Sequence, residues 1–252
     1  MRTANPALNE DIFSQAALDE PGVEAMTVGG TANKSAILLM LVIAGAMFTW
    51  QMFFGAADMA AGATAVMPWM WGGLIGGFIV ALVTVFARRW AMFTSPIYAI
   101  LEGLFLGGLS SFLEAQFPGI VVQAVGLTFA IFICILLVYK TGVIKVTDNF
   151  RIGVIAATGG IALVYLASIV MNLFGATIPY IHGSGPIGIG FSVFVIIIAT
   201  LNLVLDFDFI ERGAEMNAPK YMEWYAAFGL LVTLVWLYLE ILRLLSKLRG
   251  RD

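Results

Sequence analysis

Apolar residues along this chain fall into seven long runs, and a short polar stretch separates each run from the next. A transmembrane helix needs about 20 mostly apolar residues to cross the roughly 30 Å of hydrocarbon in a bilayer. Each run is close to that length, and tryptophan and tyrosine gather near the ends of several runs, as they do at membrane interfaces. The seven predicted spans are Ser35–Gly55, Pro68–Ala87, Pro96–Leu113, Gly119–Tyr139, Ile152–Phe174, Ile187–Leu205 and Trp224–Leu245.

Composition supports an all-α, polytopic membrane protein, a bundle of seven transmembrane helices. Of 252 residues, 61% are hydrophobic and 12% are charged, against about 45–50% apolar and about 25% charged in soluble domains. One cysteine, Cys134, and one histidine, His182, are too few for a metal cage built from such ligands. The net charge of −3 and the lack of a basic run exclude a nucleic-acid partner, so the lipid bilayer is the expected surrounding.

Three regions are expected along the chain. Residues 1–34 carry five acidic side chains and few apolar ones, which predicts a solvated cytosolic tail that is disordered or binds a partner. The tail lacks the basic start and short apolar run of a signal peptide. Residues 35–245 form the bundle, and residues 246–252 form a short basic C-terminal tail.

Lysine and arginine set the expected orientation, because cytoplasmic loops carry their excess. The loops after the second, fourth and sixth spans contain basic residues and the alternate loops contain none, which places the N-terminus in the cytoplasm. Seven full spans then send the basic C-terminus outside, against the same rule. The last span either crosses despite its basic residues or re-enters, and its length of 22 residues favours crossing.

Glycines spaced four apart predict close contacts between helices. Gly72 with Gly76, and Gly73 with Gly77, form two overlapping GxxxG patterns in the second span, and Gly103 with Gly107 forms another in the third. Contacts inside the bundle are the expected use of these patterns, with a dimer face as the alternative.

Ionisable residues inside the spans are the strongest indication of function, since each is expensive in a bilayer. Glu102 lies in the third span, Asp206 and Asp208 end the sixth, and Glu240 lies in the seventh near the outer interface. At 100° per residue, Asp206 and Asp208 point about 200° apart, so they cannot face one cavity. Asp208 is expected to pair with Arg212, and Glu240 with Arg243.

Two polar stripes end in carboxylates on the predicted cytoplasmic side. Asp206 shares its stripe with Asn202 and Ser192, and Glu102 follows Tyr98 and Ser95. They suggest a wet or proton-sharing cavity among the third, sixth and seventh spans. Arg88 and Arg89 lie on the same side, so we hypothesise that one of them contacts ionised Asp206 to close the inner mouth, and that protonation of Asp206 loosens this contact.

Three segments resemble the Bax inhibitor-1 family, also called YccA-like or transmembrane Bax-inhibitor-motif proteins. They are Leu205-Asp206-Phe207-Asp208-Phe209-Ile210, the last-span sequence from Trp236 to Leu245, and the opening Asn5-Pro6-Ala7-Leu8-Asn9-Glu10, which is similar to the longer bacterial branch. The resemblance implies a bundle in which the last helix is central, wrapped by the other six, and which acts as a pH-regulated calcium leak.

The resemblance also implies a pair of aspartates, one at the end of the sixth span and one in the seventh, that share a proton and contact arginine. Asp206 matches the first position. The second position falls on Thr233 when the Leu-Arg-Leu-Leu endings are aligned, and on Glu240 when the Leu-Tyr-Leu-Glu segments are matched. Thr233 is the better match, and gating would then involve Asp206 with Asp208, Glu102 or Glu223.

Two functions from different classes are therefore expected. One is a pH-sensitive cation leak, plausibly for calcium, because hard cations prefer the oxygen ligands available here. The other is a non-conducting regulator that binds other membrane proteins, such as a membrane-bound ATP-dependent protease. Neither requires a cofactor, and calcium would be transported and not resident. We expect no enzymatic activity, and a bacterial inner membrane as the location.

Overall fold

The computed structural model describes residues 24–144, 146–175 and 183–250. The predicted acidic tail up to residue 23, His182, and the last two residues of the predicted basic tail lie outside this part of the chain. All elements in the described part are helices. They are α2 (Val28–Phe54), α3 (Met59–Phe86), the 3-10 helix η1 (Arg88–Trp90), α4 (Ala91–Gln116), α5 (Ile120–Lys140), α6 (Asp148–Leu173), α8 (Pro186–Glu215) and α9 (Met222–Arg249).

Seven of these helices are long and apolar enough to cross a membrane, and they coincide with the seven predicted spans. The chain is therefore an all-α polytopic bundle, as the hydrophobic pattern predicts. The helices are longer than the apolar runs at several ends. Helix α2 begins seven residues before the predicted span, because Thr27 caps it by accepting a hydrogen bond from the backbone N–H of Gly30.

Helix α8 differs most from its predicted boundary. The sixth span is predicted to end at Leu205, but the helix continues for ten more residues to Glu215. No proline intervenes, and the chain turns only at Asn217, whose positive φ of 52° is left-handed. Asp206 and Asp208 therefore lie within a continuous helix and not at its end.

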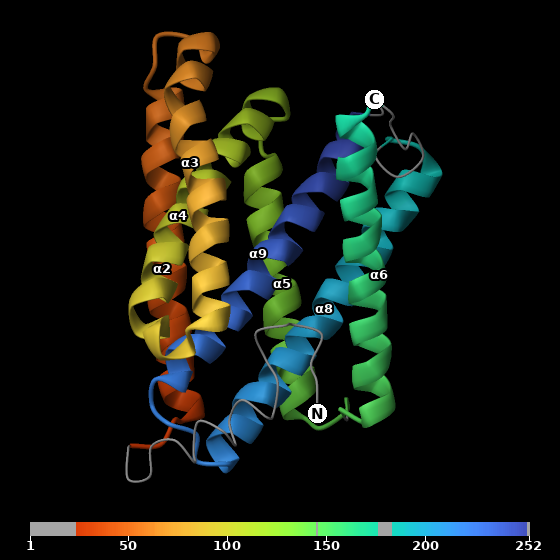
Figure 1. Cartoon of the computed structure of the whole chain (residues 1–252). Coiled ribbons are helices and arrows are strands. Elements are labelled where there is room, and N and C mark those ends of the chain that lie inside the picture. The colour runs from red at the N-terminus through yellow and green to blue at the C-terminus, as the bar shows by residue number, and fades with distance from the viewer. Residues whose placement is uncertain (1–23, 145, 176–182, 251–252) are drawn as a thin grey trace.

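Helix α9 is central, as expected. It runs diagonally through the bundle (Figure 1) and packs against α2, α4, α5 and α8. The expectation that all six other helices wrap it is too simple, because α3 packs mainly on α2 and α4, and α6 packs mainly on α8. Helix α9 is uninterrupted, and its C-terminal residue Arg249 donates to the carbonyls of Phe117 and Pro118 at the end opposite Met222. Helix α9 is thus one continuous helix that is long and apolar enough to cross a membrane.

Glycines let α2, α3 and α4 approach closely. A methyl group at Gly73 of α3 would lie 2.5 Å from the Leu101 carbonyl of α4, and one at Gly103 of α4 would collide with the Val42 carbonyl of α2. Both GxxxG patterns that contain these residues therefore make contacts inside the bundle, as expected. Gly72, from the overlapping pattern, faces open space.

The outward surfaces of the bundle are apolar. Helices α3 and α6 bury little of their length, and both present large exposed hydrophobic side chains such as Phe78 and Leu163. In water such surfaces would aggregate, whereas lipid tails solvate them. The surface thus requires a bilayer as the surrounding medium.

Candidate functional site

Asp206 lies in the interior of the bundle. Its exposed fraction is 1%, and every residue from Asn202 to Phe207 is buried, so α8 is covered on all sides at this level. Helix α8 packs here among α9, α5 and α6. The structure therefore places a carboxyl group in the interior, where an ionised form requires compensation.

Asp208, two residues further along α8, forms ion pairs with two arginines. Its carboxylate pairs with Arg212 one turn along α8 at 3.0 Å, as predicted, and with Arg151 of α6 at 2.8 Å. Arg151 is only 3% exposed. Sequence reasoning missed this second arginine because the pairing joins two helices 57 residues apart. Asp208 thus ties α6 to α8, and the expected separation of Asp206 and Asp208 agrees with these partners.

Glu102 lies in α4 between α3 and α9. It is 8% exposed, and the Tyr98 hydroxyl one turn earlier hydrogen-bonds to its carboxylate. One Glu102 oxygen would lie 3.4 Å from a methyl group at Gly77 of α3, which is van der Waals contact, so the carboxylate faces α3 at this glycine. Tyr98 packs edge-on against Phe228 of α9, with ring centroids 5.0 Å apart. The predicted stripe on α4 therefore does reach the central helix.

Arg88 and Arg89 lie in η1, which connects α3 to α4 and contacts α9. The Arg88 guanidinium sits over the ring of Tyr225 in α9, 6.0 Å from its centroid. Arg89 is exposed. Both arginines thus occupy the end of the bundle at which α9 begins, the same end as Asp208.

The predicted polar stripe on α8 makes contacts between helices. Asn202 is 3% exposed and donates to the Thr158 hydroxyl of α6 at 2.8 Å. Ser192, further along α8, accepts a hydrogen bond from Lys247 of α9 at 2.9 Å. Lys247 belongs to the predicted short basic C-terminal tail; it is 6% exposed and also donates to the Gly188 carbonyl. Polar residues of the stripe therefore connect α8 to two neighbours.

The two candidates for the second acidic position have different surroundings. Thr233 is 4% exposed, and its hydroxyl donates to the Gly229 carbonyl of its own helix at 3.3 Å. Glu240 is 2% exposed and forms the predicted pair with Arg243 at 2.9 Å. Tyr165 of α6, which sequence reasoning missed, donates to the same Glu240 oxygen at 2.8 Å. Glu240 lies 18 residues along α9 from Met222, a rise of about 27 Å.

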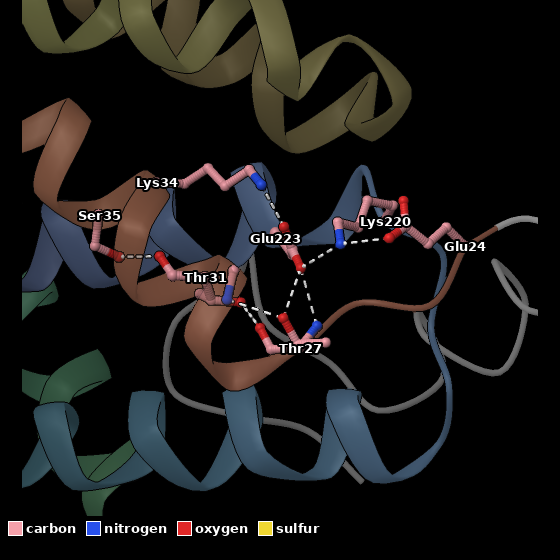
Figure 2. Close-up of polar contacts among 8 residues, drawn as sticks. Glu24, Thr27, Thr31, Lys34, Ser35, Lys220 and Glu223 are labelled. Atoms are coloured by element: carbon pink, nitrogen blue, oxygen red, sulfur yellow. Dashed lines mark hydrogen bonds and ion pairs between the residues drawn. The ribbon is translucent and has the colours of Figure 1, made fainter.

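Glu223 forms the densest polar cluster in the described part of the chain, and Figure 2 shows its partners. Its side chain is fully buried near the start of α9. One oxygen accepts from the Thr27 backbone N–H at 2.9 Å and from the Thr27 hydroxyl at 3.1 Å. The other pairs with Lys34 of α2 at 2.5 Å. Lys220 approaches the oxygen that Thr27 binds, at 3.5 Å. We call Glu24, Thr27, Lys34, Lys220 and Glu223 the N-terminal clamp.

The clamp joins the chain before α2 to the loop before α9. Lys220 donates to the Glu24 carboxylate at 3.1 Å, and this hydrogen bond raises the pKa of the exposed Lys220 ammonium above its ordinary value. Backbone hydrogen bonds reinforce the junction, from the Met26 N–H to the Ala218 carbonyl and from the Lys220 N–H to the Glu24 carbonyl. Glu223 also meets the N-terminal end of α2, where the helix dipole favours an anion.

Gly30 is essential to the geometry of the clamp. A methyl group at Gly30 would collide with the Glu223 carboxylate, whereas one at the adjacent Gly29 would meet nothing within 4 Å. The first turn of α2 therefore admits the carboxylate only because residue 30 has no side chain. The sequence offered one signal for this cluster, a glutamate at the start of an apolar span, but not its partners.

Carboxylates in the described residues do not gather into a metal site. No group of three or more histidine, cysteine, aspartate or glutamate side chains there could hold an ion. The buried acids are instead distributed, each with partners from a different helix.

Fold and site together define a polytopic α-helical membrane protein with several buried ionisable groups. The family model described as Bax inhibitor 1 like matches residues 5–250, almost the whole chain. The protein belongs to this family, which agrees with the resemblance noted in the sequence. Comparisons with curated proteins and with solved structures return no significant match.

Proposed function

We propose that the protein is a pH-sensitive cation leak in a bacterial inner membrane, that calcium is the conducted ion, and that the protein has no enzymatic activity. In this proposal the N-terminus is cytoplasmic, so the end of the bundle that contains Arg88 and the N-terminal clamp faces the cytoplasm. The buried carboxyl group of Asp206 carries the proposal. Carboxylates inside transmembrane segments are rare, and they mark ion or proton pathways more often than other intramembrane residues do.

Protonation is the proposed switch. Ionised Asp206 would contact Arg88 or Arg89 and close the cytoplasmic mouth, and proton uptake would remove the charge that sustains this contact. Burial of Asp206 at 1% exposure supports the idea, because an interior charge depends on its partners far more than an exposed one does. Glu102 is the second proposed titrating group, whereas Asp208, held by two arginines, serves as an anchor between α6 and α8.

Calcium is proposed from the chemistry of the available ligands. Carboxylate, carbonyl and hydroxyl oxygens suit a hard cation, and the interior of the bundle offers them without histidine or cysteine competitors in the described residues. The absence of a carboxylate cluster there is compatible with a leak, since a conducted ion must leave as easily as it enters.

Calcium flux into proteoliposomes tests the proposal directly. The purified protein should conduct more at pH 6 than at pH 7.5, and Asp206→Asn, which mimics the protonated side chain, should conduct at both. Asp148→Asn is the matched control, because Asp148 is an exposed carboxylate at the same end of the bundle. It should retain the pH dependence of the wild type.

Flux at the empty-liposome baseline for both wild type and Asp206→Asn, with the protein folded, would contradict the leak. The regulator that binds other membrane proteins would then become the leading proposal. Copurification of a membrane-bound protease with the intact protein would support that alternative.

A further inference from the structure

An apolar pocket of about 400 Å³ separates α2 from α5 on the side of the bundle. Helix α2 packs against α3, α4 and α9, and α5 packs against α9 and α8, so α9 lies behind the pocket. Leu230, Leu231 and Leu234 are its lining residues from α9. The volume lies within the range of about 300–1,000 Å³ that small-molecule sites occupy. Because both flanking helices are membrane spans, the pocket can draw its occupant from the bilayer.

The length of the pocket matches one leaflet. Its lining on α2 extends from Val28 to Leu39, and its lining on α5 extends from Phe129 to Lys140. Eleven residues separate the ends of each stretch, a rise of about 16 Å along a helix. The hydrocarbon of one leaflet is about 15 Å thick, half of the bilayer core. A lipid chain that enters at the helix ends would therefore extend to about the bilayer midplane.

Only one end of the pocket is polar. Lys140, the last residue of α5, is exposed there. Beside it the Tyr139 hydroxyl donates to the Glu211 carboxylate at 2.5 Å. The Tyr139 and Phe132 rings both pack on Phe207, with centroids 5.7 Å apart in each pair. A rigid aromatic wall thus leads from a charged rim into an apolar interior.

We propose that this pocket binds one acyl chain of a membrane phospholipid, with the phosphate of that lipid at Lys140. An acyl chain gains little by moving from other lipid tails into an apolar pocket, because both surroundings are equally apolar. Selectivity therefore comes from the rim, where the Lys140 ammonium attracts a phosphate. This inference concerns a lipid site and does not depend on ion conduction.

Native mass spectrometry of the full-length protein in detergent tests the site, with palmitoyl-oleoyl phosphatidylglycerol as the probe. The wild type should retain one such lipid. Ala36→Trp should lose it, since Ala36 lines the pocket and is exposed, so the indole can fill the pocket without displacing packed residues. Ala44→Trp, at an exposed alanine on α2 outside the pocket lining, should retain the lipid.

A second experiment tests whether the lipid phosphate lies at Lys140. Lys140→Gln should weaken phosphatidylglycerol binding about fivefold, the effect of one basic residue at an anionic lipid surface. Palmitoyl-oleoyl glycerol, which lacks the phosphate, should bind wild type and Lys140→Gln equally. The pocket would be ruled out as the lipid site if wild type and Ala36→Trp bound phosphatidylglycerol equally. The same holds if Ala36→Trp and Ala44→Trp lost the lipid to the same extent. An unchanged affinity in Lys140→Gln would overturn the assignment of the phosphate.

Discussion

Helix α9 carries two buried glutamates, Glu223 in its first turn and Glu240 about two thirds of the way along, and the two have different partners. Both oxygens of Glu223 are engaged, one by Thr27 and the other by Lys34. Glu240 accepts from Tyr165 and Arg243 through one oxygen, whereas its other oxygen has no hydrogen-bond partner among the described residues. The first glutamate is saturated with donors, and the second is half satisfied.

The difference shows that burial alone does not define the role of an acidic residue. A buried acceptor without a partner gives up hydration and gains nothing in return, which subtracts from the value of its other contacts. Glu223 also joins segments 196 and 189 residues apart in the sequence. We therefore expect the clamp to stabilise the fold strongly and Glu240 to contribute little.

Neutralising Glu223 should have the largest effect. Glu223→Gln removes the charge that pairs with Lys34 and faces Lys220, and should lower the free energy of unfolding by about 2 kcal/mol, the scale of charged hydrogen bonds. Both lysines are partly exposed and can rehydrate, which keeps the loss below that of a fully buried pair. Unfolding by sodium dodecyl sulfate in mixed micelles measures this change in the free energy of unfolding. Glu215→Gln, at an exposed carboxylate of α8, is the control and should change little.

Adjacent glycines sharpen the same comparison. Gly30→Ala places a methyl group against the Glu223 carboxylate and should displace it from Thr27, with a loss of about 1–2 kcal/mol in the same unfolding assay. Gly29→Ala meets no neighbour and should be neutral or stabilising by up to about 1 kcal/mol, because alanine is the better helix former. Equal behaviour of the two variants would show that the clamp does not hold its geometry in solution.

Neutralising Glu240 should have the smallest effect. Glu240→Gln keeps an acceptor for Tyr165 and replaces an oxygen that has no hydrogen-bond partner among the described residues. Its remaining loss is an ion pair with Arg243, which is partly exposed, so the free energy of unfolding should fall by less than about 1 kcal/mol. A loss as large as that of Glu223→Gln would contradict the contrast between the two buried glutamates of α9.

Sequence reasoning predicted contacts between residues close together in the sequence and missed contacts between distant ones. Pairs three or four residues apart, such as Asp208 with Arg212 and Glu240 with Arg243, were predicted correctly because helix geometry alone brings them together. Arg151 and Tyr165 were missed, although each contacts one of the same carboxylates. Both come from α6, and helical spacing carries no information about which face of another helix will lie opposite.

The predicted ends of the spans differ from the ends of the helices for a related reason. The apolar run ends at Leu205, but α8 continues to Glu215, because hydropathy records the extent of the membrane and not the extent of the helix. Charged residues beyond the apolar run remain helical where they have partners on a neighbouring helix, as Asp208 has in Arg151. Lys247 shows the same effect at the end of α9, where acceptors on α8 surround a buried lysine that lies beyond the predicted span.

The sequence by itself determined seven apolar spans, the glycine faces of α3 and α4, and the family, since each depends on residue type and spacing along the chain. Tertiary structure decided the N-terminal clamp, the partners of the buried acids between helices and the pocket beside α5. These depend on how helices dock, and docking follows from shape and charge complementarity between segments as far as 196 residues apart.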